Sequence, residues 1–169
     1  MFIVIVSVAL TASMQLFTQT TAKSTDPMLR RQALAIAESV LEEIELMPFT
    51  WCDPDDANLA TATSAAGCAS LSESSMAAEA SETRYATPQL DNVNDYNGFS
   101  MSGIKDITNT AVSGLTGYSA SVVVAAAALN SITAASGDAL RITVTVTDPS
   151  GNVITLDGYR SRHAPNAAL

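Results

Sequence analysis

Acidic side chains occur in two short runs whose oxygens could bind a metal ion. The first run, DPDD, spans residues 53–56, and the second, DNVNDYN, spans residues 91–97 and includes Asp91 and Asp95. Carboxylate and amide oxygens are the ligands that Ca²⁺ prefers in proteins. The second run departs from the EF-hand loop pattern, because Val93 stands where that pattern needs an aspartate. Asp91 and Asp95 are therefore calcium-ligand candidates, with solvated turns as the alternative interpretation.

Residues suited to acid–base or nucleophilic catalysis are sparse. His163 is the only histidine, and the sequence around it suggests no partner that would position it. The patterns G-x-S-x-G, Walker A, G-x-G-x-x-G and H-E-x-x-H do not occur. Glu42, Glu43 and Glu45 cluster at one end of an expected helix, where a solvated or salt-bridged face is the simplest role. The sequence indicates a protein that is not an enzyme and uses no cofactor; a secreted enzyme would need a role for His163.

The two cysteines, Cys52 and Cys68, enclose a stretch with few side chains to bury, CDPDDANLATATSAAGC. A zinc site needs four ligands, and the single histidine lies far away in the sequence. We expect a disulfide formed in an oxidising compartment, which contributes roughly 3 kcal/mol by the chain-entropy estimate. Two free buried thiols are the alternative.

The charge of the chain limits its partners. The net charge is −9, and the eight lysines and arginines are scattered without forming a basic stripe. An acidic surface repels phosphate backbones, so the sequence argues against nucleic-acid binding as a main function. Only 15% of residues are charged, and serine, threonine and asparagine supply the polarity instead. That balance is common in proteins that work outside the cytoplasm, in agreement with a disulfide.

Residues 28–47 have the periodicity of an amphipathic helix. Asp26 and Pro27 form a helix-start signal, and Pro48 ends the pattern. Apolar residues recur every three or four positions, and we expect this stripe to pack the helix on a sheet. The stripe consists of Leu29, Ala33, Ile36, Val40, Ile44 and Met47.

The segment before the first charged residue, Lys23, is strongly apolar over its first 17 positions. A membrane crossing takes about 20 apolar residues, so this stretch is slightly short. A signal peptide would begin with basic residues and end in a clear cleavage site, and this segment has neither. A buried core helix also fits the apolar pattern. We expect these side chains to enter a membrane or pack against other subunits. They are Phe2, Ile3, Val4, Ile5, Val6, Val8, Leu10, Met14, Leu16 and Phe17.

The last third of the chain is typical of an antiparallel sheet. Apolar side chains alternate with arginine or threonine over residues 140–147, Asp148–Asn152 supply a turn, and Val153–Tyr159 return. A β-branched run at Val122–Val124 indicates another strand. Short extended pieces are also expected around Phe99–Ile104. One face of this sheet is apolar, and the helix stripe is its natural cover.

These elements predict an α+β protein. Residues 1–22 form an apolar N-terminal segment for a membrane or filament core, and residues 23–169 form a globular head. The head contains the amphipathic helix 28–47, a loop region 48–117 and an antiparallel sheet 118–161. The loops are the expected sites of contact with other subunits or external partners.

With these elements in place, the sequence resembles type IV pilin-like proteins, and among them the minor pilins of the mannose-sensitive haemagglutinin (MSHA) class. Four stretches carry the likeness, which covers nearly the whole chain: FIVIVSVALT, DPMLRRQALAIAESVLEEIELMPF, DNVNDYNGFSMSGI and ITVTVTDPSGNVITLDGYRSR. The second stretch is the most specific, whereas the terminal sheet is generic.

The resemblance implies a pilin-like fold, in which a long N-terminal helix packs on a C-terminal antiparallel sheet. It implies a structural subunit or assembly factor that catalyses no reaction. Its partners would be other pilins, the pilus assembly machinery and the bacterial inner membrane. Its head would lie in the periplasm before assembly and on an extracellular pilus afterwards.

The start of the chain departs from the family pattern. Such proteins carry a basic leader and then a motif like G-F-T-L-I-E, and neither occurs here. Phe2–Val6 resembles the interior of the family helix, so we expect that Met1 is an internal methionine, with a degenerate copy as the alternative. Lys23, Arg30 and Arg31 follow the apolar stretch, and no basic residue precedes it. Because basic flanking residues tend to stay in the cytoplasm, this charge distribution by itself would keep the head there. A missing basic leader would remove this conflict with a disulfide.

Two other functions fit the same residues. A pseudopilin of a type II secretion system would have the same fold and anchor. A membrane-anchored or secreted binding domain for calcium or glycan would use the acidic runs and need no filament.

Overall fold

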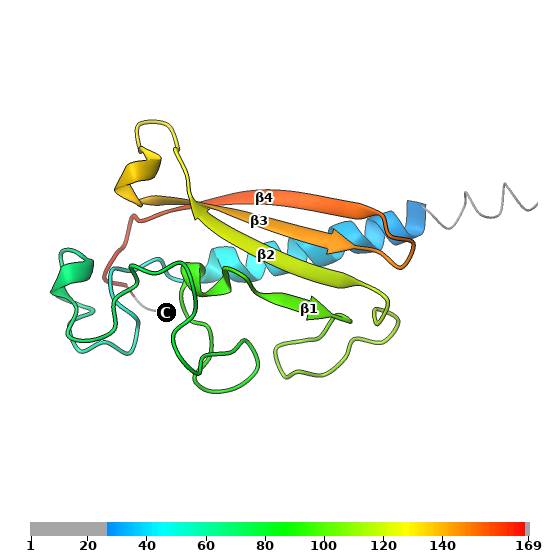
Figure 1. Cartoon of the computed structure of the whole chain (residues 1–169), viewed down its shortest axis with the longest axis horizontal. Helices are drawn as coiled ribbons and strands as arrows, with labels where there is room; N and C mark the ends of the chain where they lie inside the picture. The colour runs from blue at the N-terminus through cyan, green and yellow to red at the C-terminus, as the bar shows by residue number, and fades with distance from the viewer. Residues whose placement is uncertain (1–26, 168–169) are drawn as a thin grey trace, which may run out of the picture.

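A computed structural model describes residues 27–167 of the chain. A single long α-helix, residues 27–46, packs on a four-stranded antiparallel sheet (Figure 1). The α+β arrangement of a helix on an antiparallel sheet is therefore confirmed. Within the described residues the helix extends to residue 46, one residue short of the expected end at 47. Pro48 restricts the residue before it, so the helix stops.

The sheet is a meander in which each strand pairs with the next one in sequence. The strands are β1 (Ser100–Ser102), β2 (Ser119–Ala126), β3 (Ala139–Thr147) and β4 (Val153–Ser161). Strand β1 lies inside the region expected to be loop, where the sequence indicated short extended pieces. It is only three residues long, which explains why its periodicity gave so little signal.

The register of the sheet follows from the alternation of side chains. Val144 of β3 pairs with Val122 on one side and Leu156 on the other. The β3–β4 turn is held by Asp148, whose carboxylate accepts hydrogen bonds from the backbone N–H groups of Ser150 and Asn152. Because side chains alternate between faces, this register places one complete set of aliphatic residues on the face toward the helix.

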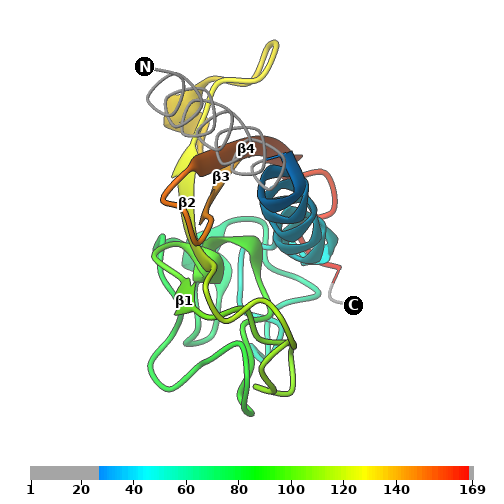
Figure 2. The same cartoon turned by 90° about the vertical axis from the view of Figure 1, so that its right-hand side faces the viewer.

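The core lies between the helix and that face of the sheet (Figure 2). The stripe side chains Ala33, Ile36, Val40 and Ile44 are buried in it, and Leu29 and Met47 are half-buried at its edge. The sheet contributes Ala120, Val122, Val124, Leu140, Ile142, Val144 and Val146. The core is thus built from small and branched aliphatic side chains, which interdigitate at short distance.

Glycine permits the closest approach between the helix and the sheet. A β-carbon placed on Gly158 of β4 would lie 2.8 Å from Cδ1 of Leu41 and closer still to the Glu45 carboxylate. Any larger residue would therefore require the ends of the Leu41 and Glu45 side chains to move from their positions against β4.

In the sequence, a loop segment formed by residues 48–99 connects the long helix to β1. In the fold, this loop segment lies at one end of the head (Figure 1). Its regular structure consists of two 3-10 helices, η1 (Ala65–Gly67) and η2 (Val93–Tyr96); a third, η3 (Ala134–Ser136), lies between β2 and β3. The disulfide expected between Cys52 and Cys68 is present.

The apolar side chains from Phe2 to Phe17, expected in a membrane or filament core, lie outside the described residues. In the part of the chain from residue 27 to residue 167, no helix combines the length and the apolar character that crossing a membrane requires.

Candidate metal centre

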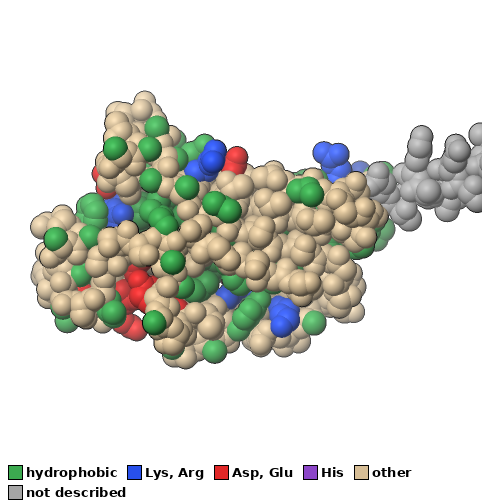
Figure 3. Space-filling view, in the orientation of Figure 1, with side chains coloured by type: hydrophobic (Ala, Val, Ile, Leu, Met, Phe, Trp, Pro, Cys, Tyr) green, Lys and Arg blue, Asp and Glu red, His purple; other side chains and the backbone are tan. Residues whose placement is uncertain are grey.

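Six carboxylates from the loop segment come together in the fold. Their oxygens form three overlapping groups, and within each group the oxygens lie within 4.8 Å of one another. The groups are Asp53 with Glu82 and Asp91, Asp53 with Glu73 and Glu79, and Glu79 with Glu82 and Asp95. We call these six residues the acidic cluster. Figure 3 shows acidic side chains gathered in the loop-rich half of one face of the molecule.

The 3-10 helix η2 positions one side of the cluster. Asn92 caps it by accepting a hydrogen bond from the N–H of Val93, at 3.0 Å. Oδ2 of Asp95 accepts in return from the N–H of Asn92 at 2.7 Å and from that of Asp91 at 3.2 Å. This capping box fixes the Asp95 carboxylate and uses only one of its two oxygens. Oδ1 of Asp95 is buried without a hydrogen-bond partner.

Asn94, also in η2, pairs with the buried Glu73 from the stretch 73–82. The backbone N–H of Glu73 donates to the carbonyl of Trp51 at 3.0 Å. The amide nitrogen of Asn94 donates to Oε2 of Glu73 and to the carbonyl of Ser75. Oε1 of Glu73 and Oδ1 of Asn94 are both left without partners. Hydrogen bonds therefore fix the position of both side chains, while one acceptor oxygen of each stays unpaired.

The cluster carries more negative charge than its surroundings compensate. Burial, followed by the charges of the other carboxylates, raises the pKa of Asp95 to about 7 and that of Asp91 to about 6. The same causes raise the pKa of Glu73 and Glu82 well above the usual range, with burial the largest. Burial likewise raises the pKa of Asp53. Each shift has the sign expected when carboxylates are desolvated together without a cation.

The aspartates of the first acidic run divide between two roles. Asp53 joins the cluster, whereas Asp55 is exposed. The carboxylate of Asp56 accepts hydrogen bonds from four backbone N–H groups, those of Asn58, Ala69, Ser70 and Leu71. The bonds from Ala69, Leu71 and Ser70 are the main cause that lowers the pKa of this carboxyl. Asp56 therefore organises the disulfide loop and is not available to a metal ion.

The structure brings both sequence-predicted calcium candidates, Asp91 and Asp95, into one cluster. Sequence reasoning missed Glu73, Glu79 and Glu82, which lie in a small, polar stretch without periodicity. The only available signal was that these are the sole acidic side chains in residues 70–82. His163 is exposed, and its ring Nδ1 lies 3.3 Å from the carbonyl oxygen of Ser161.

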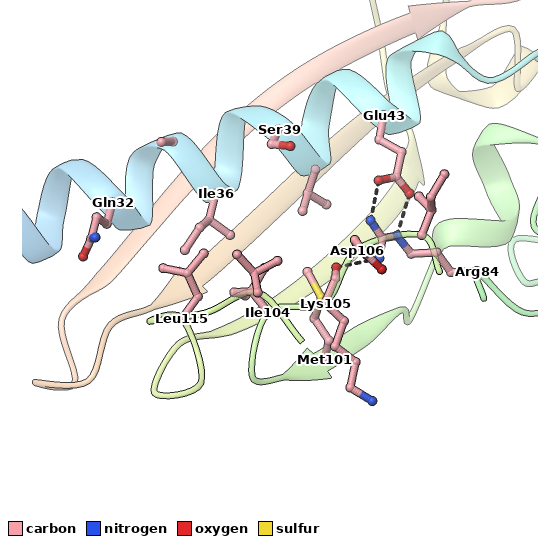
Figure 4. A pocket seen from close by; sticks show the side chains of 14 residues that line it. Gln32, Ile36, Ser39, Glu43, Arg84, Met101, Ile104, Lys105, Asp106 and Leu115 are labelled. Carbon is pink, nitrogen blue, oxygen red and sulfur yellow. Dashed lines mark hydrogen bonds and ion pairs between the residues drawn. The ribbon is translucent and has the colours of Figure 1, made fainter. Parts of the chain in front are cut away.

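A second polar contact ties the loop segment to the long helix. Nε and one terminal nitrogen of Arg84 donate to the two carboxylate oxygens of Glu43, each at 2.6 Å. Its other terminal nitrogen donates to the carbonyl of Lys105 at 3.0 Å. Figure 4 shows this pair at one end of a groove whose apolar wall includes Ile36 and Ile104. Glu43, expected on a solvated or salt-bridged face, is thus an anchor for the loops.

Comparison of the chain with models of known protein families, with curated proteins and with solved structures finds no match. The fold and the acidic cluster are therefore interpreted from their own geometry.

Proposed function

We propose that this chain is a pilin-like structural subunit or assembly factor of a bacterial type IV filament, of the MSHA minor-pilin kind. The observation that carries the proposal is the position of the long helix. The helix packs one face on the sheet, and its first described residue, Pro27, lies at one end of the described molecule (Figure 1). The apolar residues 1–22 come earlier in the sequence, separated from Pro27 by residues 23–26. A head carried on such a helix suits assembly by helix packing in a membrane and in a filament.

The outer face of the helix supports the same function. Met28 and Leu46 are 63% and 69% exposed, although both are large apolar side chains. Exposed side chains of this kind are suited to contacts with neighbouring subunits. The partners would be other pilins and the assembly machinery, with the inner membrane as the site before assembly. A disulfide agrees with a periplasmic and then extracellular head.

The test is to follow the protein in its own cells with an epitope tag at the C-terminus. We expect it in the membrane fraction and in sheared filaments, with Cys52 and Cys68 oxidised. Ile5→Lys, which puts a charge into the apolar segment 1–22, should abolish filament incorporation, whereas the control Ser24→Lys, beyond that segment, should not. A head found in the cytoplasm with reduced cysteines would overturn the proposal.

Deletion of the gene separates the filament subunit from the pseudopilin alternative. We expect loss of surface pili with normal release of secreted enzymes. Normal pili combined with retention of those enzymes inside the cell would show instead that the chain serves a secretion system.

A further inference from the structure

The acidic cluster leaves buried oxygens without the partners that such atoms need. Six of them make no hydrogen bond in the described part of the chain: Glu73 Oε1, Glu79 Oε2, Glu82 Oε2, Asp91 Oδ1, Asn94 Oδ1 and Asp95 Oδ1. An unsatisfied buried acceptor costs about 1–3 kcal/mol, and more when it is charged. Five carboxylate oxygens and one amide oxygen are buried here without a hydrogen-bond partner. We infer that a ligand supplies these missing interactions in the working protein.

The unpartnered groups are not surface carboxylates that happen to be close together. Glu73 and Asp95 are each only 3% exposed, and Asn94 is fully buried. Oxygens of Glu73 and Asp95 lie within 4.8 Å of those of Glu79, so both side chains point into the cluster. Asn94 supports the same conclusion independently. A buried carboxylate can take up a proton, but an amide oxygen does not do so at ordinary pH and still needs a donor or a cation.

Within residues 27–167 no ion pair joins a basic side chain to the cluster, although the charge of Glu73 acts on the buried Arg162 guanidinium. The two ion pairs found there join Arg84 to Glu43 and Arg162 to Asp138, and neither includes a cluster residue. All three nitrogens of the Arg84 guanidinium donate to Glu43 or to the Lys105 carbonyl. The described residues therefore provide no ion-paired cation for the cluster.

The donor set identifies the kind of cation. All available ligands are oxygens; the two cysteines are joined in a disulfide, and the only histidine is exposed, which disfavours zinc and copper. Ca²⁺ takes six to eight oxygens at about 2.3–2.6 Å, so ligands on opposite sides of it lie about 4.8 Å apart. The oxygens within each group of the cluster lie no farther apart than this span, so one Ca²⁺ can reach all the members of a group. Mg²⁺ requires shorter bonds and near-ideal octahedral geometry, which side chains from several loops supply poorly.

We propose that the acidic cluster binds Ca²⁺, with Glu73, Glu79, Glu82, Asp91 and Asp95 as ligands and Asp53 and Asn94 completing the site. The bound ion would join three parts of the loop segment: the disulfide loop at Asp53, the stretch 73–82 and the capped helix η2. Since only residues 97–99 separate η2 from β1, the ion would also fix the loops close to the sheet. Calcium outside cells reaches the millimolar range in which extracellular modules bind it. The head would then acquire its final loop structure only where calcium is present.

The single tryptophan provides a direct probe of the site. Trp51 is adjacent to Cys52, and its carbonyl accepts the hydrogen bond from the N–H of Glu73. Tb³⁺ replaces Ca²⁺ at oxygen sites and emits when a nearby tryptophan is excited. We expect the chelator-treated full chain in detergent to sensitise Tb³⁺ luminescence, and CaCl₂ to quench it competitively. Absence of sensitised emission, or equal displacement by MgCl₂ and CaCl₂, would overturn the proposal.

Matched charge removals locate the site. Glu73→Gln and Glu82→Gln should each weaken Ca²⁺ binding at least about tenfold in calorimetric titration. Glu38→Gln removes the same charge from the exposed face of the helix and should change the affinity less than about twofold. Equal weakening by all three variants would show simple charge screening and no site.

Thermal unfolding of the unmodified full chain provides a test that does not depend on variants folding. Saturating CaCl₂ should raise the Tm by on the order of 5 °C, and NaCl at matched ionic strength should not. If CaCl₂ has no effect on the Tm, the cluster is a feature of the apo fold and the inference is wrong.

Discussion

The head contains two regions built on different physical principles. The helix–sheet core, made of the long helix and strands β2–β4, buries mainly aliphatic side chains. These side chains need only contact with one another, because they have no hydrogen-bonding groups. The loop segment, residues 48–99, adds Phe49, Leu90, Val93 and Tyr96 to that core, but it also buries carboxylates, amides and an arginine that rely on hydrogen bonds and a covalent link. Hydrophobic burial is non-directional and largely insensitive to solution conditions. Polar burial depends on every partner being present, so we expect the loop segment to respond to redox state and pH, and to Ca²⁺ if the proposed site binds it.

The C-terminal residues belong physically to the loop segment. The Arg162 guanidinium lies 3.8 Å from the ring centre of Phe49 and 4.1 Å from that of Trp51. Asn166 donates to the carbonyls of Leu59 and Ala62 at 2.6 and 2.7 Å. The end of the chain is thus a further brace across the loops, again through directional contacts. The two regions should respond differently to substitution.

The largest effect is expected in the core. Ile142→Ala removes a fully buried side chain from the middle of β3 and should lower the free energy of unfolding by about 4 kcal/mol. Chemical denaturation followed by circular dichroism measures this loss. The loss should be the same with CaCl₂ and with a chelator, because the core contains no metal ligand. A loss that calcium restores would contradict the separation of the two regions.

Removal of the disulfide should act mainly on the loop segment. Replacing both Cys52 and Cys68 with serine frees a loop whose closure contributes roughly 3 kcal/mol. Amide hydrogen exchange should accelerate in residues 53–72 while the amides of β3 remain protected. Equal acceleration in both places would show that the head unfolds as one cooperative unit.

The Arg84–Glu43 pair connects the two regions, and its loss should have an intermediate effect. Arg84→Met leaves the half-buried Glu43 carboxylate without its charged partner, and should lower stability by about 2 kcal/mol. A double-mutant cycle with Glu43→Gln isolates the coupling between the two side chains. Arg30→Met, on the exposed face of the helix, is the matched control and should be nearly neutral. A coupling energy near zero would contradict the role of this pair as an anchor.

The smallest effect concerns Asp56 and depends on pH. Backbone N–H donors lower the pKa of this carboxyl in the fold, so its contribution is present above the unfolded-state pKa. The contribution is lost as the pH falls through the lower folded-state pKa. Asp56→Asn should therefore destabilise the disulfide loop at neutral pH, and its difference from the unmodified chain should shrink in strong acid. NMR amide exchange at Ala69, Ser70 and Leu71 measures this; a difference independent of pH would contradict it.

Local periodicity explains how much of the fold was predictable. In residues 28–47 the spacing of apolar side chains directly reports the helical turn, and over residues 140–147 the alternation reports the pleat of a strand. Strand β1 and the 3-10 helices are too short for a period to emerge. The disulfide could be anticipated because the chain has only two cysteines.

The acidic cluster was predictable only in part. Asp91 and Asp95 attracted attention because they lie together in an asparagine-rich run. Their neighbours in space, Glu73, Glu79 and Glu82, are scattered through a polar stretch and carry no local sign of a shared site. Burial, which makes these groups unusual, is a property of the folded chain and not of residue type.

The sequence by itself determined the two layers of the head, because the helical stripe and the strand alternation are encoded in neighbouring residues and each requires a partner face. Only the tertiary structure decided which carboxylates meet. Three separate loop stretches are brought together by contacts between them, such as the hydrogen bonds from the Glu73 N–H to the Trp51 carbonyl and from the Asn94 amide to the Glu73 carboxylate. That meeting depends on long-range contacts, and it turns ordinary acidic residues into a candidate calcium site.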